Sequence, residues 1–126
     1  MDSTTTTTIS QQIVLNYSGE DDLSSVCELI LRSHVPPVTG FDKECARGLS
    51  SSLELLSLSN NRLTSITTLS PLFNVMELNL NFNQIGPKIS LTRPLPQLRK
   101  LYLSNNKLDN VDNFSTIFPN LESLCL

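Results

Sequence analysis

One frame, L-x-x-L-x-L-x-x-N-x-L, recurs along the chain and constrains its fold more than any other feature. Its full copies span Leu53–Leu63, Val75–Ile85 and Leu98–Leu108, and a fourth copy begins at Leu121. The copies start 22, 23 and 23 residues apart. A fixed period of this length is typical of a solenoid, in which each repeat forms one coil that buries its apolar face only by stacking on its neighbours.

The middle of each copy predicts a short strand. Two leucines separated by one residue stand at the same place in each full copy: Leu56 and Leu58, Leu78 and Leu80, Leu101 and Leu103. Alternation with a period of two is the pattern of a strand with one buried face. We therefore expect an α/β solenoid with a curved parallel sheet, whose remaining residues return along the convex side.

Each full copy also places an asparagine three residues after the second strand leucine: Asn61, Asn83 and Asn106. A buried amide can both donate to and accept from backbone groups of adjacent coils, because it carries both kinds of atom. The alternative is an asparagine in a surface turn. The constant distance from the strand favours a ladder of asparagines along the solenoid.

The returns between strands differ from one another. Apolar residues spaced by three follow the first and third strands and predict 3₁₀-like or short helical returns: Ile66, Leu69 and Leu72, then Val111, Phe114 and Ile117. The second return contains Pro87, Pro94 and Pro96, which discourage a helix. We expect it to be extended, with Ile89, Leu91 and Leu95 pointing inward.

The first 49 residues lie outside the frame. Residues 1–8 include a threonine run and predict a disordered tail. We expect residues 9–49 to form a cap with strand and helix, and residues 50–126 to form the repeats. The alternative for the cap helix is a helix that binds a partner.

The cap is predicted to contain three elements. Ile13 and Leu15 alternate and suggest an edge strand or a degenerate first coil. Acidic residues precede the apolar series that starts at Leu23, which predicts a helix that ends near Ser33 or His34. A second helix is expected over 42–47, closed by Gly48 at its C-terminal end.

Composition and motifs exclude several functions. The net charge of −3 gives no basic field for nucleic acid, and the chain holds one histidine, His34, and no phosphate-binding glycine motif. Three cysteines without C-x-x-C spacing, and no secretory signal or membrane-spanning run, favour a cytoplasmic or possibly nuclear protein. We therefore predict no catalytic, cofactor-binding or metal-binding residues and no enzyme activity.

The residues between the strand leucines should form columns on the concave face. The candidate partner-binding residues in these columns are Glu77, Asn79, Phe82, Lys100, Tyr102 and Asn105. Aromatic residues are enriched at binding hot spots. Glu77 and Lys100 are close enough across neighbouring strands to pair. The alternative is that this face is ordinary solvated sheet.

These repeats resemble the short intracellular class of leucine-rich repeat proteins, typified by the protein phosphatase 1 regulatory subunit. The resemblance implies a non-enzymatic scaffold that binds an unidentified protein partner through its concave face. We expect no small-molecule ligand, no membrane contact and no direct nucleic-acid contact. The alternatives that it leaves open are a regulatory subunit of a phosphatase and a protein component of a ribonucleoprotein or of a cytoskeletal or ciliary complex.

The last copy is incomplete. It stops at Leu126, before the expected asparagine and its turn. A solenoid that ends there exposes its last apolar layer and a strand edge. We therefore expect the sequence to be a fragment whose last coil is frayed or prone to aggregation.

Overall fold

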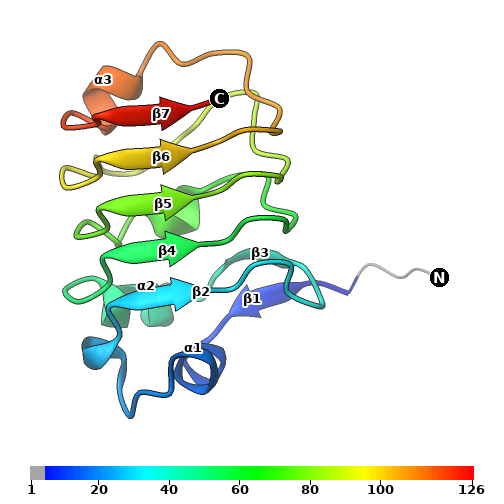
Figure 1. The fold of residues 1–126 in the computed structure, drawn as a ribbon, viewed down its shortest axis with the longest axis vertical. Helices are drawn as coiled ribbons and strands as arrows, with labels where there is room; N and C mark the ends of the chain where they lie inside the picture. The colour runs from blue at the N-terminus through cyan, green and yellow to red at the C-terminus, as the bar shows by residue number, and fades with distance from the viewer. Residues whose placement is uncertain (1–4) are drawn as a thin grey trace.

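Five parallel strands stack into one sheet in the computed structural model, which describes residues 5–126 (Figure 1). In spatial order they are β2 (Glu28–Ile30), β4 (Leu55–Ser57), β5 (Glu77–Asn79), β6 (Lys100–Tyr102) and β7 (Ser123–Cys125). Leu56, Leu78, Leu101 and Leu124 stand in register across the last four strands. The predicted parallel sheet of a solenoid is confirmed.

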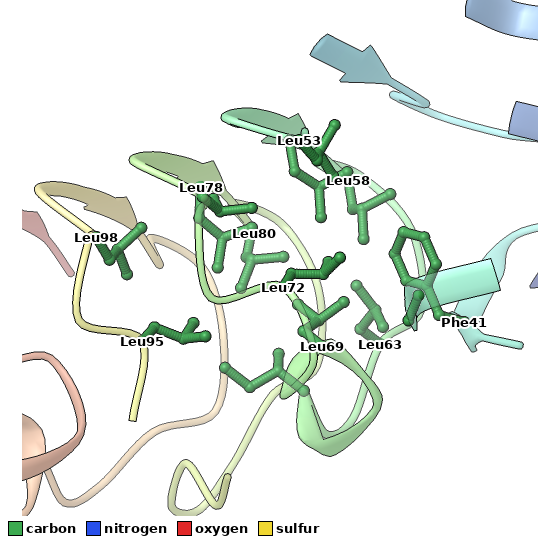
Figure 2. Close-up of a cluster of buried hydrophobic side chains, with 14 of the residues drawn as sticks. Phe41, Leu53, Leu58, Leu63, Leu69, Leu72, Leu78, Leu80, Leu95 and Leu98 are labelled. Carbon is green, nitrogen blue, oxygen red and sulfur yellow. The ribbon is translucent and has the colours of Figure 1, made fainter. Parts of the chain in front are cut away.

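Leucines from the strands and from the returns meet in one continuous core. Figure 2 shows Leu58, Leu78 and Leu80 pointing from the strand side toward Leu69 and Leu72 of the first return. All five side chains are almost completely buried. Full burial of a leucine contributes roughly 1.5–3 kcal/mol, so the stacked layers provide the main stabilisation of the coils.

The returns follow the sequence prediction closely. The first contains a 3₁₀ helix, η2 (Thr67–Leu69), and the third a short helix, α3 (Phe114–Ile117). The second return has no helix; Ile89 and Leu95 are buried there, and Leu91 is partly buried. This confirms the prediction of an extended return.

Val111, the first of the three apolar residues of the third return, lies outside the core. Its side chain is 39% exposed. Val111 precedes α3, and its carbonyl accepts a hydrogen bond from the Phe114 amide at 3.1 Å. Its side chain therefore stays outside the apolar layer that Phe114 and Ile117 enter.

A small strand pair lies beside the first coil, where a disordered tail was predicted. β1 (Thr7–Ile9) pairs in parallel with β3 (Val38–Phe41). Thr7 is only 8% exposed and its hydroxyl donates to the Pro36 carbonyl at 2.8 Å. Thr7 and Thr8 therefore belong to a strand, which suits their β-branched side chains. The first part of the predicted tail, residues 1–4, lies outside the described residues.

The expected strand around Ile13 and Leu15 is wrong, because this segment forms the helix α1 (Gln11–Ser18). The side chain of Ser10 caps its first turn by accepting from the Ile13 amide. Gly19 ends the helix in the left-handed conformation, with φ of 76°. α1 contacts β2 and lies at the end of the solenoid below it (Figure 1).

The helix predicted from Leu23 is also wrong. A single 3₁₀ turn, η1 (Leu23–Ser25), leads into β2, which pairs with β4 so that Leu29 stands beside Leu56. Val26, Leu29 and Leu31 thereby occupy the places that Leu53, Leu56 and Leu58 hold in the next coil. Apolar residues at these spacings fit a helix and a repeat alike, and pairing with the sheet decides between them.

The second predicted helix is confirmed as α2 (Lys43–Leu49), although its end differs. The Asp42 carboxylate caps it by accepting from the Cys45 amide at 3.1 Å. The helix continues past Gly48 to Leu49, so Gly48 does not close it. A Cβ atom at Gly48 would lie 2.5 Å from Cδ1 of Leu23, so a larger residue there would displace the Leu23 side chain.

The three cysteines should differ sharply in reactivity. Burial raises the pKa of the Cys45 thiol to about 11, with a further contribution from the charge of Asp42. The thiolate is the reactive species, so Cys45 should resist iodoacetamide at pH 8, whereas the exposed Cys27 and Cys125 should be alkylated. Peptide mass spectrometry before and after unfolding in urea measures this. Rapid labelling of Cys45 in the native protein would contradict the buried position.

Candidate partner-binding face

The turns that follow the strands are held by asparagine side chains that are buried or half-buried. Nδ2 of Asn61 donates to the carbonyls of Leu31, Leu58 and Ser59 at 2.9, 3.0 and 3.2 Å. Its Oδ1 accepts from the Val38 amide at 2.9 Å. The amide of Asn61 thus bridges the first and second coils with both of its polar atoms.

Asn83 and Asn106 repeat this arrangement one coil further on each time. The Leu58 carbonyl accepts from both Asn61 and Asn83, each at 3.0 Å. The Leu80 carbonyl accepts from Asn83 at 3.1 Å and from Asn106 at 2.9 Å. Consecutive asparagines share a carbonyl, so the ladder is continuous and fixes the exits of the strands relative to one another.

The concave face presents two columns of side chains that point away from the core. The first column contains Glu28, Leu55, Glu77, Lys100 and Ser123, and the second contains Ile30, Ser57, Asn79, Tyr102 and Cys125. The four strand residues proposed from the sequence are therefore neighbours on β5 and β6. Lys100 is exposed, whereas Glu77, Asn79 and Tyr102 are half-buried.

The ion pair that the sequence allows between Glu77 and Lys100 does not form. Their Cα atoms are paired in register, but the ion pairs within residues 5–126 are Arg47–Glu44 and Arg99–Glu122. Exposed ion pairs contribute little free energy, so register alone does not hold two long side chains together. The charges of Glu77 and Lys100 in the first column therefore remain available to a partner.

Sequence reasoning missed Glu28 and Ile30, because it placed them in a helix. Ile30 is 50% exposed at the start of the second column. The signal that would have found it is the spacing of Val26, Leu29 and Leu31, which matches the first half of the repeat frame.

Phe82 lies three residues after the end of β5 and has an unusual backbone conformation. Its φ is 59°, and its side chain is 56% exposed. The equivalent residues in other coils have nearly the same φ: Ser33, Asn60 and Asn105 at 52°, 58° and 62°. Asparagine adopts this left-handed region readily, whereas a bulky aromatic residue rarely does.

The backbone explains why the left-handed conformation is kept. The Phe82 amide donates to the Ser104 carbonyl at 2.8 Å, as the Asn60 amide does to the Asn81 carbonyl at 2.9 Å. These bonds continue the ladder between coils whatever side chain is present. The phenyl ring of Phe82 therefore adds strain without adding to the core.

Comparison with known proteins agrees with this geometry. A Leucine Rich Repeat family model matches residues 52–73 and 97–125. The fold is a leucine-rich repeat solenoid. The unmatched segment between the two matches contains the proline-rich return, and no curated protein shows significant similarity to the chain. Leucine-rich repeat domains generally mediate protein–protein interactions and are typically not enzymes.

The described residues contain neither a cluster of metal-ligating side chains nor a membrane-spanning helix. No group of three histidine, cysteine, aspartate or glutamate side chains in residues 5–126 is arranged to hold a metal. None of the helices found there is both long and apolar enough to cross a bilayer. His34, the one histidine, has Nδ1 2.7 Å from the Pro36 carbonyl and its ring beside that of Tyr17.

One polar atom of the concave columns lacks a partner. Within the described residues, Ser57 Oγ is the only buried side-chain nitrogen or oxygen without a hydrogen bond. It lies between Ile30 and Asn79 in the second column. A buried hydroxyl without a partner costs about 1–3 kcal/mol, so the hydroxyl of Ser57 does not stabilise the fold.

Proposed function

We propose that the chain is a non-enzymatic scaffold that binds a protein partner through the concave face of its solenoid. The observation that carries the proposal is Phe82, an exposed aromatic side chain kept at a strained backbone position at the edge of this face. Strained residues cluster at functional sites, and exposed aromatic residues are frequent binding anchors. Ile30 and Tyr102 supply further apolar surface, and Glu77, Asn79, Lys100 and Asn105 supply polar groups around it.

We also propose a closer classification. The 22- and 23-residue steps between coils support the short class of leucine-rich repeats typified by the protein phosphatase 1 regulatory subunit. The three free cysteines support a reducing compartment, the cytoplasm or the nucleus.

Replacing Tyr102 with alanine tests the proposed face. Tyr102 is half-buried among its column neighbours, so the variant should keep the fold while it removes a central contact. Affinity capture of the full chain from cells, followed by quantitative mass spectrometry, should show a loss of roughly tenfold or more in the recovery of the main partner.

The matched control is Tyr17→Ala. Tyr17 is more exposed than Tyr102 but lies on α1, outside the sheet. The Tyr17→Ala variant should leave the recovery of the partner unchanged. Equal recovery by the Tyr102 variant and the wild type would place the binding surface elsewhere on the solenoid.

A further inference from the structure

A hollow lies on the side of the solenoid opposite the concave columns. It has a volume of about 510 Å³ and is formed by α2, η2 and the second return. Its lining includes cationic, hydroxyl-bearing and aromatic side chains: Lys43, Arg47, Thr67, Thr68, Phe73 and Arg93. Its size falls within the range of about 300–1,000 Å³ that is common for ligand pockets.

The hollow is cationic in a chain whose net charge is negative. Lys43 and Arg47 lie four residues apart on α2 and therefore share one helix face, and Arg93 comes from the second return. Glu44 pairs with Arg47 at 3.1 Å but does not line the hollow. Within residues 5–126, neither Lys43 nor Arg93 forms an ion pair.

The wall between the cations combines an apolar and a polar surface. The ring of Phe73 is 38% exposed there. Thr68 Oγ1 accepts from the Phe41 amide at 3.2 Å, and no described hydrogen bond uses its own proton. That hydroxyl is therefore free to donate to an anionic group inside the hollow.

We propose that this convex hollow binds a short acidic segment of a protein partner, with an apolar side chain against Phe73 and carboxylates facing Lys43, Arg47 and Arg93. The charges favour a short segment over a nucleic acid, because three cations neutralise few phosphates and the chain has a net charge of −3. The site adds a second surface to the proposed scaffold and does not depend on the concave face.

Nuclear magnetic resonance of the ¹⁵N-labelled full chain tests this site. The probe is an acetylated, amidated pentapeptide with one central phenylalanine and two glutamates on each side. Its titration should shift amide signals of α2, η2 and Thr92–Arg93, and the binding should weaken with added salt. The pentapeptide with lysines in place of glutamates should cause no such shifts.

Variants of the hollow complete the test. Lys43→Ala combined with Arg93→Ala should weaken binding roughly fivefold or more, while the spectrum stays dispersed. Arg62→Ala removes an exposed arginine that does not line the hollow and should leave binding unchanged. The absence of shifts at millimolar peptide, equal binding of the lysine peptide, or no effect of the double variant would overturn the proposal. None of these results depends on a partner of the concave face.

Discussion

Replacing Asn83 with alanine is expected to lower the free energy of unfolding by about 3 kcal/mol, because it opens the centre of the asparagine ladder. The substitution leaves the Leu63 amide without its acceptor at 2.9 Å. It also removes the donor to the carbonyls of Leu58, Leu80 and Asn81. Urea unfolding followed by circular dichroism measures the change.

Two further variants separate the ladder from general effects of losing an amide. Asn83→Asp keeps an acceptor for the Leu63 amide but faces the carbonyls with a charge, so it should destabilise at least as much as alanine. Asn16→Ala changes an exposed asparagine on α1 and should alter stability by less than about 0.5 kcal/mol. A wild-type unfolding midpoint for Asn83→Ala would mean that the ladder contributes little to stability.

The ladder illustrates what a repetitive sequence makes predictable. Leu58, Leu80 and their equivalents recur in register, so local ambiguity at one copy is resolved by the others. The first coil was mispredicted because it departs from the repeat frame. Val26 to Leu53 is a step of 27 residues, and His34 stands where the other coils have asparagine. The sequence of a single divergent copy is equally compatible with a helix and with a repeat coil, and only its pairing with β4 distinguishes the two structures.

The two candidate surfaces likewise have some features that the sequence predicts and others that it does not. Strand alternation predicts that Glu77 and Lys100 share a column, because register follows from the repeat. The lack of an ion pair between them depends on the conformations of two long, flexible side chains, which no sequence pattern encodes. The convex hollow joins Lys43, Phe73 and Arg93 from separate segments, so it is recognisable only once the coils are stacked.

Phe82→Asn should change stability and binding in opposite directions. Asparagine tolerates the left-handed conformation better than phenylalanine, so we expect the free energy of unfolding to rise by about 1 kcal/mol. The Phe82 amide keeps its bond to the Ser104 carbonyl, because that bond uses only the backbone. The same variant should lose partner recovery by roughly tenfold or more, because a hot-spot aromatic contact is gone.

The reciprocal variant Asn105→Phe is the matched control. Asn105 is exposed and has φ of 62°, so phenylalanine there should lower stability by about 1 kcal/mol without removing any contact of Phe82. If Phe82→Asn instead destabilises the protein, its ring packs usefully in the isolated chain and the strain argument fails. If it stabilises the protein and partner recovery is unchanged, Phe82 is not an anchor. A gain in stability coupled to a loss of binding is the combination expected of a residue that is retained for its partner.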